Sequence, residues 1–295
     1  MELTLSDIGW QAHPEVWVLV IGLAALAWYV SRVLQPNAIA AGYPPLSRSN
    51  TRWFVIAVAS LWVASDWPVH DVAEEYLYAV HMFQHLFISM LVPAMFLLAA
   101  PNWIFDLLAP EGSAARRVLR LASRPIVAGV VFNALTLFLH WTTLVQLSFE
   151  NGSFHFAVHL VVFLSGLLMW MPVIGPVAEW RLPPVGQCIY LFMMSIVPTV
   201  PGGWLVFAEQ VVYRHYDTPE RLWGISALTD QQAAGVIMKL VGGFFLWGVI
   251  LVIFARWAAE EQKRDVAARK ERHALTFEQV EKQFAESEAP AEPSR

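Results

Sequence analysis

The chain alternates between long apolar segments and shorter polar stretches, a pattern typical of a polytopic membrane protein. A membrane-spanning helix needs roughly 20 mostly apolar residues. Seven segments meet this requirement, and we expect them near residues 15–34, 53–67, 77–100, 125–147, 154–174, 186–208 and 231–255. The segment at 53–67 is short and ends in Asp66-Trp67-Pro68. The pattern therefore predicts an all-α fold in which residues 1–257 form a transmembrane domain of seven helices.

Two local features modify this arrangement. Pro198 and Pro201-Gly202-Gly203 lie inside the sixth apolar segment and are expected to bend or break that helix, which neighbouring helices can accommodate in a membrane. Residues 258–295 are polar and charged and end in EAPAEPSR. We interpret them as a cytoplasmic helical tail that frays into disorder.

Lys and Arg fix the direction in which the segments cross, because cytoplasmic loops carry an excess of basic residues. Sixteen of the 19 basic residues fall in the stretches after the first, third, fifth and seventh segments. Residues 68–76 and 148–153 contain none, and in the stretch 209–230 acidic residues outnumber the basic ones. This alternation requires an odd number of spans. It predicts an N-terminus outside and a C-terminus in the cytoplasm.

Composition supports a membrane protein and excludes several other classes. Apolar residues make up 57% of the chain and charged residues 15%, whereas soluble domains carry about 25% charged residues. The single cysteine, Cys188, excludes an internal disulfide and a CxxC site. The start of the chain lacks the basic residues of a signal peptide, so the first apolar segment is expected to be retained. No basic and aromatic groove for nucleic acid is apparent.

Histidines gather at one predicted depth of the membrane. His81 and His85 lie one to two turns inside the outer end of the third span, and their spacing of four residues places both on one helix face. His155 and His159 repeat this spacing near the outer end of the fifth span, and His140 lies toward the outer end of the fourth. Interfacial histidines often act as interhelical hydrogen-bonding groups. Two HxxxH pairs at matching depth instead favour a metal site.

Softer candidate ligands lie close by. Met82 follows His81, and Met238 lies in the outer half of the last span; thioethers favour Cu(I), although methionines are also common packing residues. Asp230 opens the last span, either as a ligand or as the N-cap of its own helix. Lys239 lies about 13 Å beyond Asp230. Such a deep lysine is expected to face the bundle interior or a wet cavity, where Asp66 is one conceivable partner.

These residues resemble the caa3-type cytochrome c oxidase assembly factor (CtaG) family. The similarity rests on three ordered segments within residues 52–250: DWPVHDVAEEYLYAVHMFQHLFISMLVPAMFLLAAP, LHWTTLVQLSFENGSFHFAVHLVVFLSGLLMWMPVIGP and DQQAAGVIMKL. The HMxQH element is fairly specific. At Lys239 the sequence departs from the family, in which an apolar or aromatic residue is common. The residues carried over from the family are His81, Met82, Gln84, His85, His140, His155, His159, Asp230 and Met238.

The resemblance implies a non-enzymatic protein of the bacterial plasma membrane that helps to mature haem-copper oxidase. Delivery of copper to the oxidase is the role usually proposed for the family, and the nearby thioethers favour Cu(I) as its form. The implied partners are cytochrome c oxidase subunits, a soluble copper chaperone on the outer side and the lipid bilayer.

Two other functions are compatible with the histidines. A membrane di-iron hydroxylase or desaturase also uses HxxxH pairs, but HxxHH boxes are absent and the histidines face outward. A b-type haem protein would place histidines of facing helices, such as His85 and His159, on the two sides of the iron.

Overall fold

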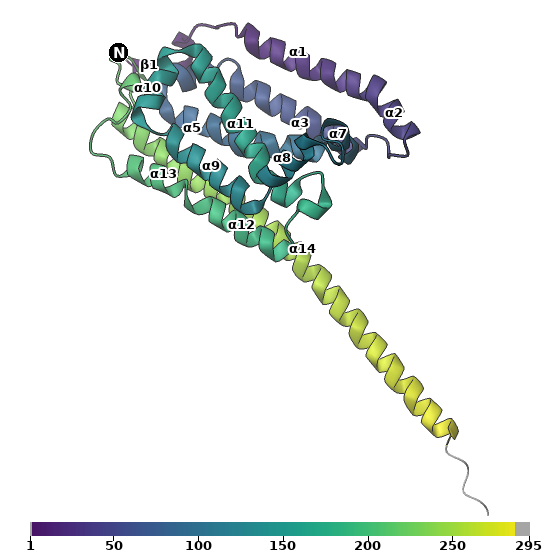
Figure 1. Ribbon diagram of the computed structural model, residues 1–295. Helices are drawn as coiled ribbons and strands as arrows, with labels where there is room; N and C mark the ends of the chain where they lie inside the picture. The colour runs from purple at the N-terminus through teal and green to yellow at the C-terminus, as the bar shows by residue number, and fades with distance from the viewer. Residues whose placement is uncertain (1, 287–295) are drawn as a thin grey trace, which may run out of the picture.

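The protein is a helical bundle from which the last helix projects (Figure 1). The computed structural model describes residues 2–286, except the side chains of residues 2, 273–276 and 278. The all-α prediction is confirmed. Two strands of two residues each, β1 (Glu2–Leu3) and β2 (Arg221–Leu222), pair in parallel with Leu3 opposite Leu222. This pairing ties the start of the chain to a loop about 220 residues later.

Five helices in the described part of the chain are long and apolar enough to cross a membrane. They are Pro14–Ala40, Tyr78–Ala99, Gly152–Ile174, Pro184–Val206 and Ala227–Arg272. A sixth span results if α8 (Ala114–Ala122) and α9 (Pro125–Leu139), which meet at 71°, are taken as one. The predicted second span corresponds to α3 (Arg48–Ser65), which is too polar in its first turns to be counted. A count of seven therefore stays a prediction.

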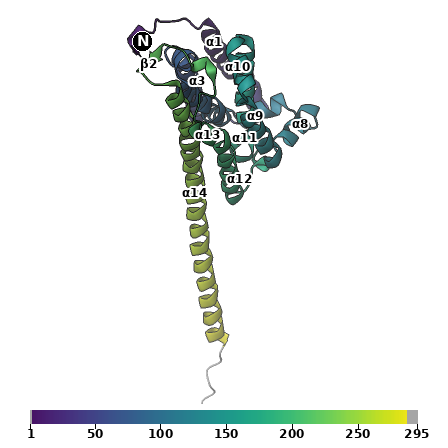
Figure 2. The same cartoon turned by 90° about the vertical axis from the view of Figure 1, so that its left-hand side faces the viewer.

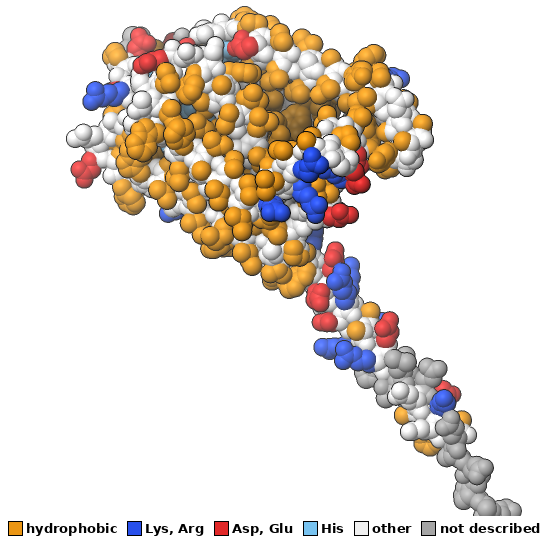
Figure 3. All heavy atoms as spheres, viewed as in Figure 1, with side chains coloured by type: hydrophobic (Ala, Val, Ile, Leu, Met, Phe, Trp, Pro, Cys, Tyr) orange, Lys and Arg blue, Asp and Glu red, His pale blue; other side chains and the backbone are white. Residues whose placement is uncertain are grey.

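The surface of the bundle is apolar. Hydrophobic side chains cover most of its visible face, while charged side chains lie at the rim near the N-terminus and beside the point where the last helix leaves (Figure 3). Large apolar side chains such as Ile126, Val130 and Phe244 are 81%, 62% and 71% exposed. Water would penalise so extensive an apolar surface, whereas hydrocarbon does not. The chain is a membrane protein.

Two helices organise the packing. The last helix, α14 (Ala227–Glu286), packs against α5 (Tyr78–Leu86), α12 (Pro184–Ile196) and α13 (Thr199–Val206). Helix α11 (Gly152–Ile174) packs against α9, η4 (Phe87–Leu91) and α6 (Val92–Ala99). The first span, composed of α1 (Pro14–Tyr29), η2 (Val30–Leu34) and α2 (Gln35–Ala40), lies at the edge of the bundle beside α3 (Figure 1).

The third span changes its hydrogen-bonding pattern where proline enters it. Pro93 has no N–H to donate to the carbonyl four residues earlier, and the preceding turn, η4, is π-helical. Gly166 of α11 lies against the carbonyl oxygen of Ser89, where an added Cβ would come within 2.0 Å. The indole of Trp170 donates a hydrogen bond of 2.8 Å to the carbonyl of Met90. The irregular turn therefore fixes how closely α11 approaches the third span.

Two of the predicted spans contain breaks. The sixth divides into α12 and α13 around Pro198, as the sequence predicts. The fourth was expected to run over 125–147, but α9 ends at Leu139 and α10 (Thr142–Glu150) forms a separate helix. The remaining short elements are η1 (Leu5–Asp7), α4 (Val69–Asp71), η3 (Val72–Tyr76), α7 (Asn102–Leu108), η5 (Ala178–Trp180) and η6 (Arg214–Tyr216).

Helix α14 is continuous for 60 residues and extends far beyond the bundle (Figure 2). The predicted boundary at residues 257 and 258 is therefore a change from apolar to charged composition within one helix. The final nine residues of the predicted tail, 287–295, lie outside the described residues.

Candidate metal centre

The histidine pair of α5 points into the bundle. The helix begins at Tyr78, and its apolar face packs against α14. His81 is 6% exposed, and its ring lies 4.4 Å from that of His85, one turn further along. The predicted common face is therefore present. It faces α11, because the rings of His81 and His159 are 6.1 Å apart.

The histidine pair of α11 meets the pair of α5 across the bundle. His159 Nε2 lies 3.1 Å from His85 Nε2, and the His155 and His159 rings are 4.3 Å apart. Tetrahedral coordination with metal–nitrogen bonds of 2.0–2.1 Å places two ligand nitrogens about 3.3 Å apart. The observed separation is close to this value. The two HxxxH pairs thus form one cluster, in which two imidazole nitrogens point at the same small volume.

Glu74 adds a carboxylate between the two helices. Its Oε1 lies 3.0 Å from His81 Nδ1 and 3.2 Å from His155 Nε2. Burial raises the pKa of Glu74, but the electrostatic attraction of the neighbouring imidazole of His81 and the hydrogen bonds of His155 and His81 outweigh this effect and hold the pKa well below its usual value. Glu74 is therefore ionised and can neutralise positive charge in the cluster.

The cluster contains two overlapping groups of potential ligands. His81, His85 and His159 form one, and Glu74, His155 and His159 form the other, with the ligand atoms of each group all within 4.8 Å of one another. His159 belongs to both. We call these five residues the histidine cluster. Each group offers three protein ligands and leaves a position for an exogenous ligand, as metal sites that exchange ligands do.

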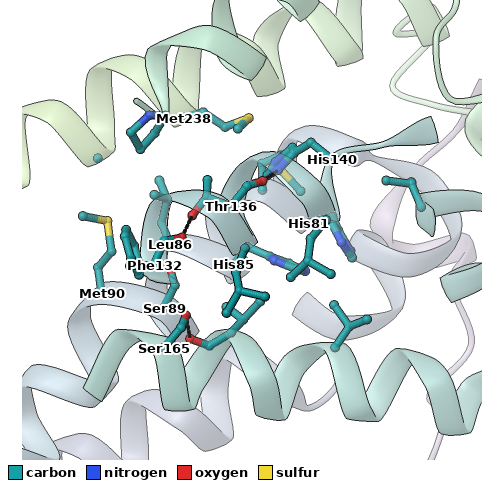
Figure 4. A pocket seen from close by; sticks show the side chains of 18 of the residues that line it. His81, His85, Leu86, Ser89, Met90, Phe132, Thr136, His140, Ser165 and Met238 are labelled. Carbon is teal, nitrogen blue, oxygen red and sulfur yellow. Dashed lines mark hydrogen bonds between the residues drawn. The ribbon is translucent and has the colours of Figure 1, made fainter. Parts of the chain in front are cut away.

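A cavity of about 100 Å³ continues from the histidine cluster into the bundle. His81, His85 and His140 lie around it, and Met238 approaches from the α14 side (Figure 4). Met82 also lines it. The Nε2 atom of His140 is buried without a hydrogen-bond partner among the described residues, but His140 belongs to neither ligand group. Three of the predicted histidines and both predicted methionines thus surround one space, whereas His155 and His159 do not line it.

Two residues that the sequence analysis associated with the site, Asp230 and Gln84, lie outside the histidine cluster. Asp230 is 2% exposed and accepts hydrogen bonds from the backbone N–H groups of Tyr78 and Ala79 at 2.7 and 3.0 Å. It caps the start of α5, whereas Ser226 caps α14 itself. Gln84 points away from the histidine cluster and donates to the carbonyl of Ala64 in α3 at 2.7 Å. Neither side chain is in a ligand group.

The segment between α13 and α14, residues 207–226, covers the histidine cluster. Gln231, fully buried, accepts from the N–H groups of Val212 and Tyr213 and donates to the Tyr213 carbonyl. The His215 ring stacks on Phe149 at 3.9 Å and contacts the Glu74 carbonyl through Nε2 at 2.8 Å. Asp230 and Gln231, at the start of α14, therefore hold α5 and this segment in place.

Sequence reasoning missed Glu74 and His215. Glu74 lies in η3, and the extended residue Leu77 separates that turn from α5, so its spacing of seven residues to His81 is not a helical one and gave no signal in the sequence. For His215 the sequence carries no signal either, because a loop residue reaches the cluster through a contact across 141 positions.

The fold and this cluster define a membrane helix bundle with a buried histidine and carboxylate centre. The family described as cytochrome c oxidase caa3 assembly factor (Caa3_CtaG) matches residues 27–260, and the chain belongs to it. Similar proteins are the uncharacterized protein Mb0105 of Mycobacterium bovis and the uncharacterized protein MT0111 of Mycobacterium tuberculosis, each 26% identical over 263 residues. The alignments cover 80% of this chain but only 39% of each relative. No solved structure matches.

Proposed function

We propose that this protein handles copper during the assembly of a cytochrome c oxidase, holding Cu(I) at the histidine cluster. The observation that carries the proposal is the 3.1 Å approach of His85 Nε2 and His159 Nε2, with His81, His155 and Glu74 around them. Imidazole suits copper, and Met82 and Met238 in the adjoining cavity supply the thioethers that favour its reduced form.

The overlap of the two ligand groups suits transfer better than storage. An ion leaving one group keeps His159 as a ligand while it enters the other. Each step exchanges part of the coordination shell, so the ion is never released into the apolar cavity. This arrangement calls for no chemical conversion, and we assign the protein a non-enzymatic role.

The same proposal places the histidine cluster at the outer face of the bacterial plasma membrane. Supporting it, Arg116, Arg117, Arg120 and Arg124 lie in or directly after α8, beside the start of α9, whereas the histidine cluster lies beyond its end. With α3 and the bent α8–α9 pair counted as spans, the chain crosses seven times, with its N-terminus outside and its tail in the cytoplasm. The partners proposed are oxidase subunits and a soluble copper chaperone on the outer side.

The alternatives have less support. A cavity of about 100 Å³ is well below the roughly 300–1,000 Å³ of pockets for drug-sized ligands, and the facing histidines are too close for a porphyrin between them. A membrane di-iron hydroxylase or desaturase uses HxxHH boxes, and the sequence contains none. Its two HxxxH pairs supply the four histidines of the ligand groups among the described residues.

The proposal is tested by measuring metal in the detergent-purified protein beside a His81→Ala/His85→Ala double variant. We expect Cu(I) in the parent and at least a tenfold weaker affinity in the double variant, with equal amounts of both proteins in the membrane. His273→Ala, in the tail, serves as the histidine control. Equal copper binding by parent and double variant, or none by the parent, contradicts the proposal.

A further inference from the structure

Lys239 is an exposed cation on the membrane-facing side of α14. The sequence led us to expect it in the bundle interior or in a wet cavity; it does not face the interior, because its side chain is exposed. Asp66, its conceivable partner, instead accepts hydrogen bonds from the indoles of Trp17 and Trp62 at 3.0 and 2.7 Å. No described residue forms an ion pair or a hydrogen bond with Lys239.

The depth of Lys239 follows from its neighbours on α13. Gln232 donates to the carbonyl of Ala208 at 3.0 Å, just beyond the end of that helix, and the backbones of Gly202 and Gly235 touch below this contact. Lys239 lies seven residues past Gln232, or about 10 Å deeper, within a hydrocarbon layer of about 30 Å. A charged side chain facing lipid at this depth is unfavourable, so it calls for a partner.

The lysine lies in an open groove of about 610 Å³ between α14 and the α12–α13 break. Exposed apolar side chains, including Ile196, Val200 and Phe244, form its walls. Ser195, Thr199 and Gly243 contribute small or hydroxyl-bearing positions. Small residues allow helices in a membrane to approach closely, and hydroxyl groups add interhelical hydrogen bonds. The groove thus has the small residues of a helix-packing surface. The hydroxyls of Ser195 and Thr199 already donate to backbone carbonyls close by in the chain, so Lys239 is the polar group of the groove that lacks a partner among the described residues.

We propose that this groove binds a membrane-spanning helix of another protein, whose span carries an aspartate or a glutamate that pairs with Lys239. Charge complementarity identifies the occupant, because a carboxylate at the same depth neutralises the lysine and is neutralised by it. A second copy of this chain does not qualify. In its five apolar spans the described acidic residues are Glu15, Asp230 and those of the charged part of α14 beyond Arg256, all away from this depth.

The docked helix would also complete a wall of the internal cavity. Ser195 and Gly243 line both the groove and the cavity that adjoins the histidine cluster. A partner helix in the groove therefore lies one layer of side chains away from the proposed copper path. The proposal itself rests on Lys239 and the groove, and is independent of metal binding.

The test places a photo-crosslinking phenylalanine analogue at Phe244, on the wall of the groove, in the full-length protein in membranes of its native host. Phe244 is 71% exposed, and an aromatic replacement preserves its shape. We expect a crosslink to a membrane-spanning peptide that contains Asp or Glu. Lys239→Gln is expected to lower the yield at least fivefold, while Lys263→Gln, a lysine of the tail, leaves it unchanged.

A charge exchange makes the test specific. Lys239→Asp abolishes the crosslink, and changing the identified carboxylate of the partner to lysine restores it. Crosslinks to lipid alone, to a second copy of this chain or to a span without a carboxylate would overturn the proposal, as would an undiminished yield in Lys239→Gln. Copper measured on the same membranes separates the docking proposal from the copper proposal, because Lys239→Gln is expected to keep the parental copper content.

Discussion

Replacing Asp230 by alanine distinguishes a helix cap from a metal ligand. In the structure its two carboxylate oxygens accept the N–H groups of Tyr78 and Ala79, both at the first turn of α5. Two buried donors left without an acceptor cost about 2–6 kcal/mol. Removing a buried carboxylate recovers part of this, because its desolvation cost disappears. We therefore expect the stability of the bundle to fall by about 2–3 kcal/mol.

The assay is thermal unfolding of the purified protein, followed together with copper binding below the transition. A loss of this size lowers the unfolding midpoint by about 4–10 °C. Asp217→Ala, which removes an exposed ion pair with Arg221, provides the acidic control and changes the midpoint little. The cap interpretation would be refuted by an Asp230→Ala protein that unfolds at the parental temperature but has lost its copper, since that is the behaviour of a ligand.

Three further changes test other parts of the structure. His159→Ala removes the ligand shared by both groups, so titration with a Cu(I) chelator should show a larger loss of affinity than for His155→Ala; equal losses would contradict the overlap. Glu74→Gln removes the charge that orients two histidines and should weaken copper binding about 10–100-fold, whereas parental affinity would exclude this role. Gly166→Ala forces a Cβ against the Ser89 carbonyl and should destabilise the protein by about 1–3 kcal/mol, measured by thermal unfolding, while Gly22→Ala, in open space, should not.

Much of the fold could be predicted because few backbone structures satisfy their own hydrogen bonds inside a bilayer. Long apolar segments must be helices, and this requirement located Tyr78–Ala99, Gly152–Ile174 and Pro184–Val206 to within two residues. The helices Pro14–Ala40 and Ala227–Arg272 continue beyond the ends predicted for them, at residues 34 and 255. The break at Pro198 followed from the missing N–H of proline. The end of α9 at Leu139 could not be anticipated, since residues 140–147 are apolar enough to continue a helix and contain no proline or glycine.

The depth of the candidate centre along the helices could be predicted, but not which helices come together to form it. A spacing of four residues places His81 with His85 and His155 with His159, and the alternation of basic residues puts both pairs at one end. Sequence does not say which helices are neighbours, so the contact between His85 and His159 appears only in the structure. For the same reason, the sequence could not show that Asp230 accepts hydrogen bonds from residues about 150 positions earlier in the chain. Nor could it show which side of α14 carries Lys239 away from the bundle.

The unbroken course of α14 has a mechanical consequence. At 1.5 Å per residue its 60 residues form a rod about 90 Å long, and Asp230 lies within one turn of its first residue. One continuous helix therefore joins the charged tail mechanically to Asp230, the carboxylate that caps the first turn of α5.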